Sequence, residues 1–143
     1  INLGRDVLAR LSTPLSMNFT DAALHGVPDE AAVSATGGLY LELLADLDAL
    51  VATDPAFLLG PWLAMARSLS ENASDCIARA APVVSTCPDF FEWNARVQLT
   101  TWNPTPKGAA KVPRGPVDYA SKHWSGLISD YYRERASRVT KLA

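Results

Sequence analysis

Apolar residues recur at every third or fourth position along much of the chain, a spacing that is typical of amphipathic helices. A first helix is therefore predicted over residues 1–11, where the apolar positions are Leu3, Val7, Leu8 and Leu11. Residues 12–30 contain two prolines and a glycine, so they are predicted to form a helix–loop connection.

A longer helix is predicted to open at Asp29-Glu30. It carries one broad apolar stripe, made by Leu39, Tyr40, Leu43, Leu44, Leu47, Leu50 and Val51. The acidic residues Glu42, Asp46 and Asp48 are expected to face mostly outward, as polar residues do opposite such a stripe. The pair Gly37-Gly38 inside this helix is expected to mark a close contact between helices rather than a ligand-binding loop.

A third helix is predicted to begin at Asp54-Pro55. Asp54 can accept hydrogen bonds from first-turn amides, and proline suits the first helical position. Gly60-Pro61 should kink this helix or end it early. The apolar residues that it is expected to carry toward a core are Phe57, Leu58, Trp62, Met65 and Leu69.

Two more helices are predicted on either side of an irregular segment, residues 103–116, which holds four prolines and two glycines. The first should run from Asp89 to about Trp102, and the second from about Asp118 to Lys141. The buried face of the final helix is expected to comprise Tyr119, Trp124, Leu127, Ile128, Tyr131 and Tyr132.

The fold class that follows is all-α, an irregular bundle of about five to six helices, because strand alternation, internal repeats and heptads are absent from the sequence. At 143 residues, with 48% hydrophobic and 20% charged residues, the chain is predicted to form a single helical domain with its own core, residues 1–143. No apolar run approaches the ~20 residues that a membrane-spanning helix needs. Because the chain starts at Ile1 and shows no signal peptide, we expect it to be a piece of a longer protein.

Charge is distributed unevenly around a net value of −2. Residues 1–92 carry 12 acids and 4 bases, whereas residues 93–143 carry 3 acids and 9 bases. The two parts can complement each other by packing together, or the second can present a basic face to an anionic partner. Nine bases diluted by three acids are not a polybasic tract, so nucleic acid is not the expected partner.

Two cysteines and two glycosylation sequons favour the secretory pathway. Cys76 and Cys87 could close a short loop by a disulfide in an oxidising compartment. Asn18-Phe19-Thr20 and Asn72-Ala73-Ser74 are acceptor motifs for N-glycosylation. The expected location is therefore the lysosome, a vacuole or the extracellular space.

The chain offers no catalytic centre, metal site or cofactor motif of its own. Glu42 and Asp46 share a helix face and could do acid–base chemistry, but a solvated face opposite the leucine stripe is the favoured interpretation. The two histidines, His25 and His123, have no Ser-His-Asp spacing around them, and zinc is disfavoured because the cysteines lack further ligands nearby. No phosphate-binding glycine motif occurs, so no cofactor is predicted.

An aromatic cluster in the last third is the candidate ligand site. Its rings are Trp93, Trp102, Tyr119 and Trp124, and the polar residues beside them are Asn94, Arg96, Gln98, Asp118 and Lys122. Sugars present apolar C–H faces and polar hydroxyl edges, so a sugar pocket combines an aromatic wall with a few placed polar groups. The same pattern also fits aromatic residues that form a core and polar residues that cap helices.

Several sequence blocks in order resemble the C-terminal region of the lysosomal-type α-N-acetylglucosaminidases. The blocks are Phe57-Leu58-Leu59-Gly60-Pro61-Trp62-Leu63, Glu92-Trp93-Asn94-Ala95-Arg96, Leu99-Thr100-Thr101-Trp102, the run 118–127 and Asp130-Tyr131-Tyr132. The agreement covers roughly residues 38–135 and is looser over residues 1–37.

The resemblance implies that the chain is the C-terminal accessory domain of a larger barrel enzyme, a retaining glycosidase that removes terminal α-linked N-acetylglucosamine, as in heparan sulfate degradation. Its two catalytic glutamates would lie in the barrel and none in this chain. The domain would pack on the barrel of the same polypeptide and border the cleft that holds the glycan substrate, and the parent could be a homo-oligomer. The expected cleft residues are Trp102, Asp118, Tyr119, Asn94 and Arg96.

A second hypothesis comes from a different class of protein. The chain could be a helical interaction module without enzymatic activity, which docks a protein or a polyanion through its basic final helix. Steeply salt-dependent polyanion binding would distinguish this module from an accessory domain.

Overall fold

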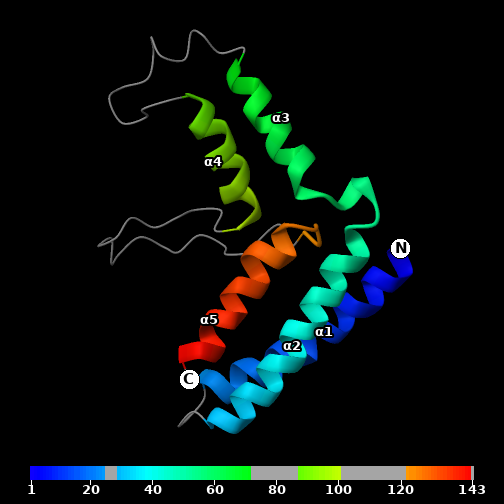
Figure 1. The fold of residues 1–143 in the computed structure, drawn as a ribbon, viewed down its shortest axis with the longest axis vertical. Coiled ribbons are helices and arrows are strands. Elements are labelled where there is room, and N and C mark those ends of the chain that lie inside the picture. The colour runs from blue at the N-terminus through cyan, green and yellow to red at the C-terminus, as the bar shows by residue number, and fades with distance from the viewer. Residues whose placement is uncertain (25–28, 72–86, 101–121, 143) are drawn as a thin grey trace. The chain divides into compact units, whose positions relative to one another are not determined.

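The computed structural model describes residues 1–24, 29–71, 87–100 and 122–142 (Figure 1). Over these residues the fold is all-α, which confirms the predicted class. The helices are α1 (Asn2–Leu24), α2 (Glu30–Val51), α3 (Leu59–Glu71), α4 (Cys87–Leu99) and α5 (Glu134–Leu142), with a short 3-10 helix η1 (Pro55–Phe57) and a π-helix η2 (Ile128–Arg133). No described helix has the length and apolar character of a membrane span.

The chain divides into two compact units, which are described separately. Unit 1 comprises Ile1–Leu59 and His123–Ala143, and unit 2 comprises Gly60–Lys122. In unit 1, α1 and α2 run side by side in opposite directions, and η2 and α5 pack on α2. The antiparallel pairing brings Gly4 near the start of α1 against the side chain of Leu50 near the end of α2.

Two apolar clusters form the core of unit 1. The first consists of Leu44, Leu47, Val51 and Ile128, with Leu8, Tyr40, Phe57 and Tyr132 packed around it. The second consists of Phe19, Val33 and Ala136, with Ala22, Ala23, Tyr40, Leu41 and Val139 packed around it. Residues from both ends of the sequence thus close one core, and the buried area is what holds the returning C-terminal segment in place.

The first helix is more than twice as long as predicted. α1 continues through Pro14 to Leu24, whereas a helix over residues 1–11 and a helix–loop connection were expected. Proline removes one backbone hydrogen bond from a helix interior. Phe19, only 4% exposed, anchors the second half of the helix in the core, and this burial offsets the loss.

The second helix begins as predicted, but only part of its apolar stripe is buried. Asp29 caps it by accepting hydrogen bonds from the amides of Ala31 and Ala32 at 3.0 and 3.2 Å. Leu44, Leu47 and Val51 are buried, but Leu39 is 56% exposed. The expectation that Asp48 faces outward is wrong, because its carboxylate accepts bonds from Ser125, Gly126 and Ser129.

Gly37 lies at a close helix contact, as predicted. A Cβ atom at this position would lie 2.9 Å from Thr140 Oγ1 and 3.0 Å from the Phe19 ring, whereas a Cβ at Gly38 would meet nothing within 4 Å. The two neighbours therefore differ in the space available to a methyl group, although they share one helix.

We expect Gly37→Ala to destabilise the protein by about 1–2 kcal/mol, because the clash with Phe19 outweighs the gain in helix propensity. Gly38→Ala should instead stabilise it by about 0.5–1 kcal/mol, because it gains propensity without a clash. Urea unfolding of the two variants measures both changes. Stabilisation by both substitutions would show that the contact at Gly37 is looser than described.

The segment after α2 differs from the prediction of one helix from Asp54. Asp54 does accept a bond from the Ala56 amide at 2.9 Å, but it caps only the short helix η1. α3 then starts at Leu59, so Gly60-Pro61 lies in a first turn rather than at a kink. Proline is tolerated there because first-turn amides lack helical acceptors in any case.

The final helix starts nine residues later than predicted. Ser125 pairs with the extended backbone at Leu58: its amide donates to Phe57 O at 2.7 Å and its carbonyl accepts from the Leu59 amide at 3.0 Å. Gly126 follows with φ +89°, a left-handed conformation that favours glycine and ends any helix continuing from upstream. The helical run therefore begins at Leu127, directly before η2, and continues through η2 and α5.

Unit 2 contains α3 and α4. Leu63, Ala66, Ala95 and Leu99 are its buried apolar residues among those described. Met65 and Leu69 were expected to face a core, but they are 62% and 56% exposed. The predicted helix from Asp89 corresponds to α4, which starts two residues earlier, at Cys87.

Candidate functional site

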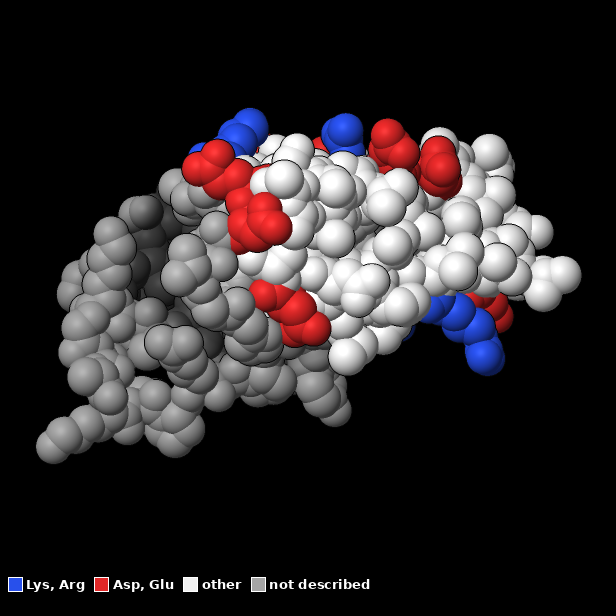
Figure 2. All heavy atoms as spheres, turned by 90° about the horizontal axis from the view of Figure 1, so that it is seen from below, with Lys and Arg blue, Asp and Glu red and all other residues white. Residues whose placement is uncertain are grey.

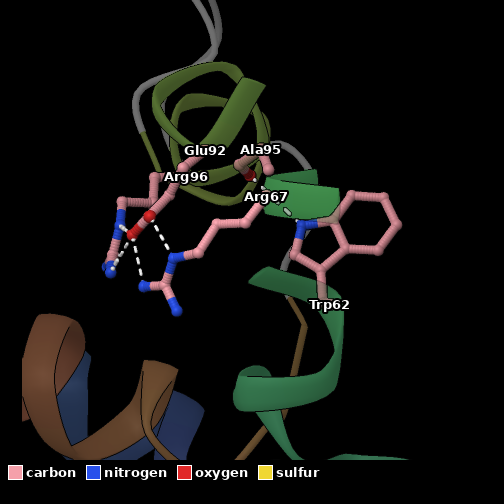
Figure 3. A network of polar contacts seen from close by, with 5 residues as sticks. All are labelled: Trp62, Arg67, Glu92, Ala95 and Arg96. Carbon is pink, nitrogen blue, oxygen red and sulfur yellow. Dashed lines mark hydrogen bonds and ion pairs between the residues drawn. The ribbon is translucent and has the colours of Figure 1, made fainter. Parts of the chain in front are cut away.

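Two arginines from different helices converge on one carboxylate in unit 2 (Figure 3). Arg96 donates to Glu92 Oε1 from Nε and Nη2 at 2.9 and 2.7 Å, one turn away on α4. Arg67 of α3 donates to both carboxylate oxygens of Glu92, from Nη2 to Oε1 at 2.9 Å and from Nε to Oε2. The paired helices are therefore linked by an ion pair in which two arginines share one carboxylate.

The arginines change the ionisation of the acid. Hydrogen bonds from Arg67 and then from Arg96 lower the pKa of Glu92 to about 2, because they favour its charged form. The same contact raises the pKa of Arg67. Glu92 is thus ionised at neutral and mildly acidic pH and cannot serve as a proton donor there.

We expect Arg96→Gln to raise the pKa of Glu92 while leaving it below 4.5, because Arg67 still donates to the carboxylate. Arg67→Gln should raise this pKa further, since the Arg67 hydrogen bond is the largest cause of the shift. Carbon-13 NMR titration of the glutamate carboxyl groups measures both changes. Because the folded-state pKa is lowered, the stability from this contact is present above pH 4.5 and is lost as the pH falls through about 2. Titration of wild-type Glu92 near 4.5 would contradict the described contact.

A groove lies between the same two helices. It has a volume of about 150 Å³ and is lined by Trp62, Met65, Ala66, Leu69, Phe91, Asn94, Ala95 and Gln98. The Trp62 indole donates to the Ala95 carbonyl at 3.4 Å, and this bond fixes the ring at the edge of the groove (Figure 3). Trp62 is only partly buried, so Trp62→Ala should cost less than the 3–5 kcal/mol typical of a fully buried aromatic.

The predicted site residues are brought together only in part. Asn94 and Gln98, two of the predicted polar residues, line the groove, and the other lining residues are apolar or aromatic. Arg96 lies two residues after Asn94, about 200° further around the helix, and contacts Glu92 instead. The candidates Trp102, Asp118, Tyr119, Asn72 and Cys76 lie outside the described residues, as does the side chain of Cys87.

Sequence reasoning missed Arg67, Met65 and Leu69 as neighbours of the predicted site. The Glu92–Arg96 spacing of four residues is a signal for an ion pair within one helix and could have been used. No local signal connects Arg67 to Glu92, because 25 positions separate them and only the packing of α3 on α4 brings them together.

A second, larger cavity of about 310 Å³ lies in unit 1, lined by Ser16, Phe19, Thr20, Ala23, Tyr40, Tyr132, Arg135, Ala136 and Val139. These lining residues include hydroxyls and one guanidinium but no carboxylate. Among the described residues no three His, Cys, Asp or Glu side chains gather as potential metal ligands. Burial, and then the Arg5 cation, lower the pKa of partly buried His123.

Comparison with known proteins places these helices in a family. The family model described as the alpha-N-acetylglucosaminidase C-terminal domain matches residues 1–142. The chain belongs to this family. It is thus a C-terminal domain of an α-N-acetylglucosaminidase-like glycosidase, as the sequence blocks predicted.

Two relatives of the family agree with this assignment. Human alpha-N-acetylglucosaminidase is 40% identical over 102 residues, which is 71% of this chain. A solved structure of a family 89 glycoside hydrolase from Clostridium perfringens, in complex with 2-acetamido-1,2-dideoxynojirmycin, is 28% identical over 96% of this chain with a TM-score of 0.69. The chain spans 11% of the human protein and 14% of the bacterial chain.

Proposed function

We propose that the protein containing this domain hydrolyses terminal, non-reducing α-linked N-acetylglucosamine in heparan sulfate-type chains or other glycoconjugates. The observation that carries the proposal is the match of the α-N-acetylglucosaminidase C-terminal domain family over residues 1–142. The names of both relatives, an alpha-N-acetylglucosaminidase and a family 89 glycoside hydrolase, support it. The reaction would retain the anomeric configuration through two glutamates about 5 Å apart, which belong to a barrel domain outside this chain.

The domain would pack on that barrel and border its substrate cleft. The expected contact surface is made by Trp102, Asp118 and Tyr119, with Asn94 and Arg96. The groove between α3 and α4 supports the role of Asn94, because the two amides of Asn94 and Gln98 among apolar and aromatic walls suit the polar edge of a sugar ring. Arg96 would contribute through Glu92, which it holds in place.

The test is hydrolysis of an aryl α-N-acetylglucosaminide by the full-length protein. Cleavage by the full-length protein, with none by residues 1–143 alone, supports the proposal. Absence of cleavage by a folded full-length protein, together with cleavage of a different glycoside, would overturn the substrate assignment. Proton NMR of the first-formed sugar would show the α-anomer if the reaction retains configuration.

Trp102→Ala should reduce kcat/KM of the full-length protein about tenfold, which corresponds to about 1.4 kcal/mol of lost transition-state stabilisation. The physical reason is the loss of an aromatic wall against the sugar, with folding left mostly intact. Leu39→Ala is the control, because Leu39 is 56% exposed on α2 and belongs neither to the aromatic cluster nor to the expected cleft residues. Unchanged kinetics in a folded Trp102→Ala variant would remove Trp102 from the cleft.

The secretory pathway, with the lysosome as its end point, is the proposed location. The human relative, an alpha-N-acetylglucosaminidase, supports this location, as do the two sequons. Asn18 is exposed on α1, so a glycan on its amide nitrogen would extend into solvent while Phe19 stays buried. A mass decrease on enzymatic removal of N-glycans that is smaller by one glycan in Asn18→Gln than in the wild type would show that the site is used.

The interaction-module hypothesis finds little support in the final helix. Arg138 pairs with Glu134 one turn away at 3.0 Å, and Arg135 lies 5.2 and 5.5 Å from the ring centres of Tyr131 and Tyr132. These contacts engage two of the bases that a polyanion would need. On the face shown in Figure 2, the Lys and Arg side chains that are coloured form no continuous patch.

A further inference from the structure

The first helix has an inner face that builds the core and an outer face that is apolar as well. On the inner face, Leu8 and Phe19 pack into the two clusters of unit 1. On the outer face, Leu3 is 79% exposed, Val7 48% and Leu11 49%. An amphipathic surface helix would carry polar residues there instead.

The exposed apolar residues are concentrated rather than scattered. Nine large hydrophobic side chains are exposed among the described residues, and five of them are Ile1, Leu3, Val7, Leu11 and Met17, on or directly before α1. Single exposed hydrophobics are ordinary, but a contiguous group marks an interaction site.

Leu3, Val7 and Leu11 have the spacing of a packing ridge. They are four residues apart, so their side chains form one inclined row about 12 Å long on the helix surface. Such i±4 ridges fit into the grooves of another helix. Asp6 beside this row is exposed and already pairs with its neighbour Arg5 at 2.9 Å, so covering the row does not strand that charge without a partner.

The exposed area of this row and the length of the relatives indicate what packs against it. Three such side chains expose on the order of 300 Å², well below the ~800 Å² per partner that a stable contact between separate chains needs. An intramolecular contact needs less, because the connecting chain supplies a high effective concentration. The chain spans only 11% and 14% of its relatives, so most of such a polypeptide lies outside these residues.

We infer that the row Leu3–Val7–Leu11 on α1 packs against the remainder of the same polypeptide, outside residues 1–143. This inference rests on the proposed function in one respect, namely that the domain is part of a larger glycosidase. The contact holds the domain against the rest of the polypeptide by burying apolar area. The inner face of α1 then packs in the core of unit 1, and its outer face packs in a second apolar contact.

Photo-crosslinking in the full-length protein tests the inference. p-Benzoylphenylalanine replaces Val7 in one variant and Arg138, whose side chain is 73% exposed on α5, in the control. After irradiation, the variant at position 7 should yield an intramolecular crosslink to a peptide outside residues 1–143, at least fivefold above the control. A crosslink to a second copy, a crosslink to residues 60–122, or a yield no higher than the control would each overturn the inference.

A second pair of variants distinguishes an effect of this row from a general effect of exposed apolar residues on the crosslink yield. Leu3→Ser with Leu11→Ser, in the protein that carries the crosslinker at position 7, should reduce the crosslink yield at least threefold. Met65→Ser with Leu69→Ser changes two equally exposed residues on α3 and should leave the yield unchanged. Equal yields in the two double variants would contradict the assignment.

The aryl α-N-acetylglucosaminide assay on the same preparations keeps the two proposals apart. Cleavage without the crosslink means that the docking row is wrong and the proposed function stands. The crosslink without cleavage means that the row docks as inferred and that the proposed substrate is wrong.

Discussion

Leu47→Ala should destabilise the protein by about 3–5 kcal/mol and lower its Tm by about 10 °C or more. Leu47 is 2% exposed and belongs to the cluster formed with Leu44, Val51 and Ile128. Truncation removes three carbon atoms from a site that is enclosed by two helices, so the walls can relax only partly into the cavity. The substitution therefore loses both the transfer free energy of the side chain and the contacts around it.

Leu39→Ala is the matched control, because it makes the same chemical change on the same helix. Leu39 is 56% exposed, so its truncation should change the free energy of unfolding by no more than about 0.5 kcal/mol. Thermal unfolding followed by circular dichroism measures both variants. A similar loss at the two positions would mean that the outer side of α2 is covered by another part of the protein.

The contrast between these leucines shows where periodicity stops being informative. Both belong to the apolar stripe that predicts α2, and the stripe alone cannot rank them. Their burial depends on which elements pack on α2, and Leu47 is covered because residues near Ile128 return from the other end of the sequence. Helix existence was therefore predictable from local spacing, whereas core membership depended on contacts about 80 positions apart.

The two misplaced helix boundaries have causes that act in opposite directions, since one helix is extended and the other is shortened. Pro14 predicts an interruption, but the burial of Phe19 holds α1 together beyond it. The spacing of the aromatic residues predicts a helix from Asp118, but the backbone pairing of Ser125 and the positive φ of Gly126 delay its start to Leu127. A glycine inside an apolar run allows either outcome, since it is tolerated in a helix and required in a left-handed turn.

The candidate site was predictable to the same limited degree. The sequence blocks identify the family. Asn94 lines a groove between α3 and α4, but its role as a ligand-contacting residue stays a prediction. The partnership of Arg67 with Glu92 was not predictable, because it depends on the packing of α3 on α4.

Asp48→Ala should destabilise the protein by about 2–4 kcal/mol, the expected cost of leaving partly buried donors without a charged acceptor. Its carboxylate accepts from the Ser125 hydroxyl at 3.2 Å, the Gly126 amide at 3.0 Å and the Ser129 amide at 3.2 Å. The two amides lie in the turn that starts the final helical run, so Asp48 acts as a cap supplied by a different helix. In the Asp48→Ala variant, hydrogen exchange of the Gly126 and Ser129 amides should become faster than in the wild type, and by a larger factor than exchange of the α2 amides.

Asp46→Ala distinguishes this role from a general effect of acidic charge. Asp46 lies two residues earlier on α2 and is exposed, so its removal should change stability by no more than about 0.5 kcal/mol. Asp48→Asn keeps one oxygen acceptor and should recover about half of the loss seen with alanine. If Asp46→Ala and Asp48→Ala cost the same in urea unfolding, the capping role would be wrong. If only Asp48→Ala is costly, the return of the chain to the core at Gly126 depends on a carboxylate that the helical pattern of α2 assigns to solvent.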